Sequence, residues 1–84
     1  MITVRLPAML HDAGGPREIG VDEAVATIGD LVAALDRRQP GIGERLRDSL
    51  YNFAVNDTLI LHGTDAHPLR DGDIVELIPT IAGG

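Results

Sequence analysis

The sequence predicts an α+β domain in which one long helix crosses one face of a mixed sheet of about five strands. Three observations support this prediction. Apolar residues alternate with polar ones near both ends of the chain, as they do in strands with one buried face. A stripe of apolar residues at helical spacing lies between these regions, over residues 28–35. The 84 residues are enough for one hydrophobic core and too few for two.

Residues 1–22 are expected to form a β-hairpin with a long loop. Apolar residues alternate with polar ones at Ile2, Val4 and Leu6, and again at Ile19 and Val21. Residues 11–16 are rich in turn-forming residues. The pair Gly14-Gly15 lacks the spacing of a phosphate-binding loop, and we interpret it as part of the turn.

A helix is predicted to begin after Thr27, which can cap its amino end together with Asp30 in the first turn. Apolar residues then recur at helical spacing, at Ile28, Leu31, Val32 and Leu35. They form a single stripe, which must lie against the sheet. The basic pair Arg37-Arg38 suits the negative carboxyl end of the helix, and Pro40-Gly41 ends it.

A short helical turn and two further strands are expected after this helix. Residues 41–50 carry apolar side chains at four-residue spacing, which is enough for one helical turn. Phe53 and Val55 indicate a third strand. Asn56-Asp57 is a tight-turn signal that leads into a fourth strand over residues 58–61.

The last strand, over residues 73–78, is apolar on both faces, which is usual for a strand in the centre of a sheet. Val75 and Leu77 can face the helix, so Ile74 and Ile78 point to the opposite face. Because the long helix covers only one face, these two isoleucines contribute to an exposed apolar patch. Such patches commonly bind partner proteins.

The composition excludes several classes of function. The formal net charge of −6 at pH 7 argues against nucleic acids and anionic membranes as partners and favours a basic protein surface. The chain has no cysteine, which removes disulfides, iron–sulfur ligation and internal thiol chemistry. All seven basic residues are arginines, so no side-chain amine is present. No signal sequence or membrane-spanning run is visible, and we expect a cytoplasmic protein.

A loop over residues 62–68 carries His62, Asp65 and His67, to which His11 could be added as a further metal ligand. We expect no metal site there, because the loop has no helical i, i+4 pair to fix the geometry of the ligands. No nucleophile with a neighbouring base and no pair of catalytic carboxylates is apparent in the sequence. The chain is therefore not expected to be an enzyme.

Residues 79–84 are predicted to form a flexible tail beyond a folded domain of residues 1–78. Pro79 has no amide donor, so the sheet is expected to end before it. The side chains then become smaller along Ile81, Ala82, Gly83 and Gly84. Two residues without a Cβ atom can enter a narrow channel, which makes the carboxylate of Gly84 the candidate reactive group.

These features together resemble the MoaD/ThiS family of sulfur carriers, small ubiquitin-like proteins with the β-grasp fold. The resemblance covers essentially the whole chain. It rests on the first strand from Met1, the Val55-Asn56 turn, the turn over residues 69–73 with its Asp71-Gly72 pair, and the tail over residues 81–84. Residues 6–10, 40–46 and 78–84 look most similar to the CysO-type carriers, which feed sulfur to a cysteine synthase.

The resemblance implies that an ATP-dependent enzyme of the ubiquitin-activating type adenylates the carboxylate of Gly84. Sulfur then displaces AMP and leaves a thiocarboxylate, from which a biosynthetic enzyme takes the sulfur. Ile81, Ala82 and Gly83 would form the access route. No cofactor would be bound to the chain itself, since the activating enzyme uses the ATP.

Other functions are compatible with the same sequence. A molybdopterin synthase small subunit would share the tail, although the aromatic-rich first strand of those proteins is absent. Thiazole synthesis, tRNA thiolation and secondary metabolism also use such carriers. A ubiquitin-like modifier would use the activated carboxylate to acylate lysines of other proteins. A binding module would use Ile74 and Ile78 with a passive tail.

Overall fold

The computed structural model describes residues 1–7, 17–47 and 51–80. Within these ranges five strands form one mixed sheet, namely β1 (Ile2–Arg5), β2 (Glu18–Val21), β3 (Tyr51–Val55), β4 (Thr58–Ile60) and β5 (Ile74–Pro79). Their order across the sheet is β2-β1-β5-β3-β4. β1 and β5 are parallel, and the other neighbouring strands are antiparallel. The predicted mixed sheet with the last strand at its centre is confirmed.

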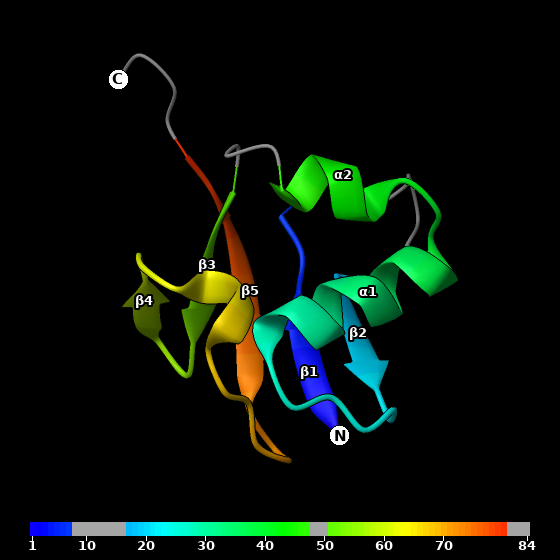
Figure 1. Cartoon of the computed structure of the whole chain (residues 1–84), viewed down its shortest axis with the longest axis horizontal. Coiled ribbons are helices and arrows are strands. Elements are labelled where there is room, and N and C mark those ends of the chain that lie inside the picture. Colours follow the sequence, from blue (N-terminus) through cyan, green and yellow to red (C-terminus); the bar gives the residue numbers. More distant parts are fainter. Residues whose placement is uncertain (8–16, 48–50, 81–84) are drawn as a thin grey trace.

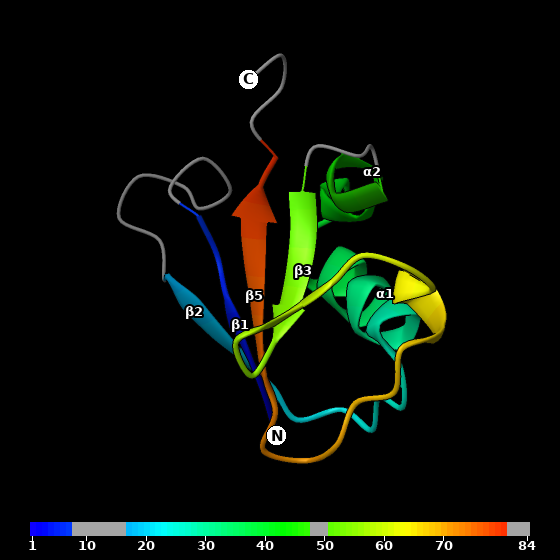
Figure 2. The same cartoon turned by 90° about the vertical axis from the view of Figure 1, so that its left-hand side faces the viewer.

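Three helical segments lie on one side of this sheet (Figures 1 and 2). The longest is α1 (Ile28–Arg38), and it is followed by α2 (Ile42–Arg47). A single turn of 3₁₀ helix, η2 (Thr64–Ala66), packs against α1. The opposite face of the sheet carries no helix in the described ranges. The predicted arrangement, one main helix and a short helical turn on one face, is confirmed.

The two ends of α1 lie where the sequence places them. Thr27 Oγ1 accepts a hydrogen bond from the Asp30 amide at 3.2 Å. Asp30 Oδ2 in turn accepts a hydrogen bond from the amide of Ala26, at 3.1 Å. In the usual capping box this second bond comes from the amide of the cap residue itself, whereas here it comes from the residue before the cap. At the other end the Gln39 amide donates to the Leu35 carbonyl at 2.8 Å, and the helix ends at Arg38.

The core lies between α1 and the sheet, and it is aliphatic apart from two aromatic rings. All four residues of the predicted helical stripe are buried: Ile28, Leu31, Val32 and Leu35. The inward-facing strand residues that meet them are buried as well: Ile2, Val4, Val21, Tyr51, Phe53, Val55, Val75 and Leu77. Burial of each large apolar side chain contributes about 1.5–3 kcal/mol, so this layer is the main source of stability.

The connection from α1 to α2 is held by one carboxylate. Asp36 Oδ1 accepts hydrogen bonds from the amide of Gly41 at 3.1 Å and from the amide of Gly43 at 2.9 Å. A Cβ atom at Gly43 would lie only 2.9 Å from the same oxygen, so any larger residue would displace the Asp36 carboxylate from this position. The bonds hold α2 beside α1, with Ile42 and Leu46 buried.

Several boundaries differ from the sequence prediction. β3 begins at Tyr51, β4 ends at Ile60, and part of the 62–68 loop is the helical turn η2. β5 includes Pro79, which pairs with Tyr51, whereas the sheet was expected to end at residue 78. Among the described residues β1 pairs with β5 only as far as Glu76, so no ladder bond from Pro79 to β1 is required there and its missing amide donor is tolerated. The division into a domain and a tail stays a prediction.

A polar network fixes the turn before β5 to the turn between β3 and β4. Asn56 has a φ of 49° and Asp57 a φ of 71°, as a two-residue hairpin turn requires. The side chain of Asn56 donates to Asp73 Oδ1 at 2.9 Å and accepts from the Ile74 amide at 3.0 Å. Asp73 Oδ2 accepts from the Arg70 amide at 2.8 Å. The start of β5 is therefore tied to two turns at once.

These bonds predict a specific dependence of stability on pH. The hydrogen bond from the Arg70 amide, followed by that from the Asn56 side chain, lowers the pKa of Asp73 below its ordinary value of 3.8. A carboxyl group with a lower pKa in the folded state stabilises the fold fully above its unfolded pKa. This contribution is lost as the pH falls through the lower folded pKa.

We therefore expect Asp73→Asn to lower the melting temperature at pH 6 and to have progressively less effect as the pH falls below 3.8. Thermal unfolding followed by circular dichroism from pH 6 to pH 2 measures the difference. Asp22→Asn is the matched control, because Asp22 is an exposed aspartate outside this network. A difference that is constant over this range would show that the charge of Asp73 is not involved.

Candidate functional site

β5 presents different side chains to the two faces of the sheet. Val75 and Leu77 face α1 and are almost completely buried, with 0% and 2% of their surface exposed. Ile74 and Ile78 are half-buried and belong to the face opposite α1, which we call the outer face. This division agrees with the orientation expected from the sequence. The use of the two isoleucines by a partner stays a prediction.

Neighbouring strands extend the apolar surface around these isoleucines. Ala54 and Leu59 are directly paired across β3 and β4 and share the outer face with them. Ala54 is only 4% exposed, whereas Leu59 is 45% exposed. Ile78 lies across from Asn52, at the end of the strand from which the tail continues. The outer face therefore has an apolar strip that Glu76 interrupts, with Ile74 on one side of this residue and Ile78 on the other side, nearer to the tail.

A row of charges crosses this face at the level of Arg5. In the register of the sheet Arg5 lies between Glu18 of β2 and Glu76 of β5. Its Nε donates to Glu18 Oε2 at 2.9 Å, and both side chains are about half exposed. An exposed pair of this kind contributes about 1 kcal/mol or less to stability. Its two carboxylates and one guanidinium leave the row acidic, which favours a basic partner.

The predicted reactive tail continues from β5. β5 ends at Pro79, and Thr80 is the last residue that the structure describes. Ile81, Ala82, Gly83 and Gly84 lie outside the described residues. β5 is parallel to β1, so its carboxyl end points away from the amino end of the chain (Figures 1 and 2). The tail therefore starts at the same end of the sheet as Ile78 and α2.

The candidate metal ligands do not form a site in the described part of the chain. No group of three or more histidine, cysteine, aspartate or glutamate side chains comes together there in a way that could hold a metal ion. His62 is exposed, His67 is half-buried, and Asp65 lies in η2, while His11 is outside the described residues. In the same ranges no helix is both long and apolar enough to cross a membrane.

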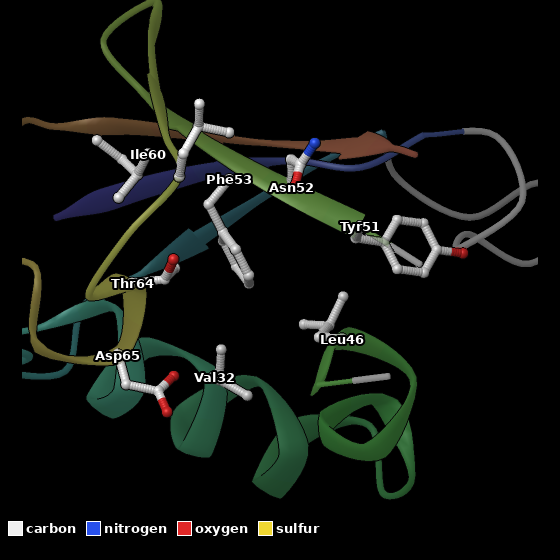
Figure 3. Close-up of a pocket in the computed structure, with 9 residues that line it drawn as sticks. Val32, Leu46, Tyr51, Asn52, Phe53, Ile60, Thr64 and Asp65 are labelled. Carbon is white, nitrogen blue, oxygen red and sulfur yellow. The ribbon is translucent and has the colours of Figure 1, made fainter. Parts of the chain in front are cut away.

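A cavity of about 430 Å³ was not anticipated from the sequence. It lies between the β3–β4 side of the sheet and the three helical segments (Figure 3). Val32, Leu46, Phe53 and Ile60 supply apolar walls, while Thr64 and Asp65 of η2 supply polar groups. No local pattern in the sequence indicated this cavity, because its walls come from elements that are far apart in the chain.

A family comparison identifies the chain. The model described as the ThiS family matches residues 4–84. The chain belongs to the ThiS family. Within it, the chain is 32% identical over 92 aligned positions to the sulfur carrier protein CysO of Mycobacterium tuberculosis, covering 99% of this chain and 98% of that protein. The family predicted from the sequence is confirmed.

Solved structures of related proteins have the same fold as this ThiS-family chain. Crystalline CysO of Mycobacterium tuberculosis superposes with a TM-score of 0.84 at 28% identity, over 96% of this chain and all of that one. The complex of BexX and CysO from Amycolatopsis orientalis gives a TM-score of 0.80 at 29% identity over the full length of both chains. These matches confirm the β-grasp fold.

A third match comes from a different assembly. The complex of subunits 1 and 2 of the molybdopterin-converting factor from Helicobacter pylori gives a TM-score of 0.65 at 25% identity, over 99% of this chain and 97% of that one. Two of these three structures are thus complexes with another protein. The ThiS-family chain is a carrier protein and not an enzyme, as the sequence predicts.

Proposed function

We propose that this ThiS-family protein carries sulfur as a thiocarboxylate on Gly84 and delivers it to a biosynthetic enzyme. The observation that carries the proposal is the similarity to sulfur carrier protein CysO over 99% of the chain, together with a match to the ThiS family that extends through Gly83-Gly84. Any catalytic groups would come from the partner enzymes. Because the reaction consumes ATP, we place it in the cytoplasm.

The chemistry of a carboxylate requires an activating step. A terminal carboxyl has a pKa of about 3.5, so at pH 7 it is ionised and is a poor electrophile. Attack of the Gly84 carboxylate on the α-phosphorus of ATP would release pyrophosphate and form an acyl adenylate. A sulfur nucleophile would then attack the carbonyl carbon and expel AMP. The absence of cysteine from the chain means that no internal thiol could intercept this acyl group.

The fold limits where the activating enzyme must bind. An extended chain advances at most about 3.6 Å per residue, so Gly84 can lie no more than roughly 14 Å from Thr80. An enzyme whose adenylating centre holds Gly84 must therefore also contact the end of the sheet from which β5 emerges. Ile78 is the apolar outer-face residue nearest to that end, and Ile74 extends the contact along the strand.

The adenylating enzyme is proposed to be of the ubiquitin-activating type, and ATP is bound by that enzyme and not by this chain. For the acceptor we favour an enzyme of the cysteine synthase type, because the similarity to CysO extends over the whole sequence. In the Amycolatopsis orientalis complex, however, a CysO protein is bound to BexX. A carrier similar to CysO could therefore also serve an acceptor of a different kind. A molybdopterin synthase small subunit is the alternative, supported by the Helicobacter pylori match.

The proposal predicts a change in the mass of the intact protein. Incubation with an adenylating enzyme, ATP and sulfide is expected to convert the protein to a form in which one oxygen is replaced by sulfur. Fragmentation should place the sulfur on Gly84, and omission of ATP should prevent the change. If pyrophosphate is released in the presence of this protein but no sulfur-bearing form appears, the chain is activated without being a sulfur carrier.

The same material tests the second candidate function, protein modification. A modifier would produce branched peptides in cell digests, with Gly84 joined to lysine side chains of other proteins. We expect no such peptides if sulfur delivery is the only use of the activated tail. The chain itself has no lysine, so chains of linked copies through lysine cannot form.

A further inference from the structure

Glu76 is the charged residue of β5, and it lies in the middle of the apolar strip on the outer face. Ile74 precedes it and Ile78 follows it on the same face, since alternate residues of a strand share a face. Across the sheet it lies between Arg5 of β1 and Ala54 of β3. The three β5 side chains are half-buried, although in the described ranges the helices lie on the other side of the sheet (Figures 1 and 2).

Arg5 is the cross-strand neighbour of Glu76, but it is bound to another carboxylate. Its Nε donates to Glu18 Oε2 at 2.9 Å. Because β1 lies between β2 and β5, this bond draws Arg5 toward β2 and away from Glu76. In the part of the chain that the structure describes, the carboxylate of Glu76 makes no hydrogen bond and no ion pair. Glu18 thus compensates the charge of Arg5, and the charge of Glu76 remains uncompensated.

A second polar side chain lies close to Glu76. Asn52 of β3 pairs with Ile78, and the next outer-face residue of β3, Ala54, pairs with Glu76. Asn52 and Glu76 are therefore diagonal neighbours on one face, which is within reach of a single long side chain. Asn52 is half-buried, and among the described residues its side chain makes no hydrogen bond. A carboxylate and a carboxamide thus lie beside Ile78 with their hydrogen-bonding capacity unused.

These two groups set a condition on any protein that covers the strip. An enzyme that holds the tail must contact the end of β5, and it would exclude water from Ile78 and the side chains around it. A carboxylate that loses its water is costly in free energy unless hydrogen-bond donors and a positive charge replace that water. Because Arg5 is held by Glu18, the donors for Glu76 and Asn52 must come from the partner.

An arginine side chain meets this condition best. Its guanidinium is planar and always charged, and its N–H groups can bond both oxygens of a carboxylate while another donates to a neighbouring amide oxygen. A lysine ammonium is a strongly hydrated point charge, so its transfer to an apolar surface is less favourable. The methylene groups of an arginine can also pack on Ile74 and Ile78.

We propose that Glu76 and Asn52 bind an arginine of the activating enzyme, and that Glu76 thereby determines which enzymes can hold this carrier. The inference rests on the proposed function, because it assigns the partner group of the same surface. Contacts with Ile74 and Ile78 would shield the charged pair from water. A partner with an apolar surface but no arginine would leave Glu76 unpaired and would bind weakly.

The test uses the adenylating enzyme of the loading assay and measures its binding to the full chain by calorimetry, without ATP or sulfide. Glu76→Gln keeps the size of the side chain and removes its charge, so it is expected to raise Kd about tenfold through the loss of charge-assisted hydrogen bonds. Asn52→Ala is expected to raise Kd about threefold, since a single neutral hydrogen bond is lost.

The matched control is Glu44→Gln. Glu44 is exposed on α2, on the helix side of the sheet, so the substitution removes the same charge away from the outer face. It should bind within about twofold of the parent, because the charge of an exposed side chain is largely screened at physiological salt. The melting temperature of each variant shows that it is folded, and neither Glu76 nor Asn52 has a side-chain hydrogen bond in the described ranges that its replacement would break.

A double-mutant cycle identifies the partner group on the enzyme. Surface arginines and lysines of the enzyme are replaced one at a time by alanine, and each variant is titrated with the parent protein and with Glu76→Gln. For one arginine we expect strong coupling: once it is removed, Glu76→Gln should change Kd by no more than about twofold. For the other positions the separate losses should multiply.

The possible failures can be told apart. If the parent protein is loaded with sulfur and Glu76→Gln binds the enzyme as the parent does, this inference is wrong and the thiocarboxylate at Gly84 stands. Equal losses for Glu76→Gln and Glu44→Gln would also overturn it, because net charge would then govern binding. Coupling to a lysine alone would overturn the assignment of an arginine. If the parent protein neither binds nor is loaded, the proposed function and this inference fail together.

Discussion

Deletion of Gly84 is expected to abolish sulfur loading completely while leaving the melting temperature within about 1 °C of the parent protein. The loss follows from geometry, since the new terminal carboxylate of Gly83 would reach up to roughly 3.6 Å less far into the adenylating centre. Displacements of about 1 Å are already enough to reduce the rate of a positioned reaction by two orders of magnitude. Loading is measured as the sulfur-bearing fraction of the intact protein by mass spectrometry.

A second variant separates the length of the tail from its chemistry. One alanine added after Gly84 converts the reactive carboxylate into an amide, so this longer chain should also fail to load. Neither change touches a residue of the hydrophobic core, and circular dichroism should therefore give parent-like unfolding. If either variant is still loaded with sulfur, the requirement for the Gly84 carboxylate is wrong. If the biosynthetic function survives although no sulfur-bearing form appears, a binding module with a passive tail becomes the better interpretation.

Ile78→Asp is expected to lower kcat/KM for ATP-dependent loading by roughly 10- to 100-fold. Burial of an isoleucine at an interface contributes about 1.5–3 kcal/mol, and each 1.4 kcal/mol corresponds to a factor of ten. Ile78 is half-buried on the outer face, opposite the core residues Val75 and Leu77, so the folded state should persist. Initial rates of pyrophosphate release at several concentrations of the carrier measure this effect.

The matched control for this variant is Ala24→Asp. Ala24 is exposed in the segment between β2 and α1, so the substitution adds the same negative charge away from β5. It should leave the loading rate within about twofold of the parent, because a surface charge alone is largely screened at physiological salt. Equal losses in the two variants would mean that net charge, and not the apolar strip, governs the encounter.

The single tail limits how partners can use this carrier. An activating enzyme and an acceptor that both hold Gly84 must bind in turn, because each must contact the end of the sheet from which β5 emerges. The hydrogen bonds of Asn56 and Asp73 join the β3–β4 turn to the start of β5 and so help to fix the position of that strand.

Local sequence signals were sufficient for most of the fold. The helix could be predicted because its apolar stripe, its Thr27 cap and its Pro40-Gly41 stop agree with one another. The orientation of β5 could be predicted because alternate residues of a strand must lie on opposite faces. The ends of the strands were less certain. Inclusion of Pro79 in β5 depends on which neighbouring strand is present at that level, and that is a property of the sheet.

By itself the sequence determined the fold class, the family and the candidate reactive group, because periodicity, turn residues and the Gly-Gly sequence are local properties of the chain. Tertiary structure alone decided that Asn56 bonds to Asp73, that Arg5 lies between Glu18 and Glu76, and that a cavity opens behind β4. Each of these features joins residues distant in sequence. Their positions follow from the register of the sheet and the packing of its helices, which local pattern does not encode.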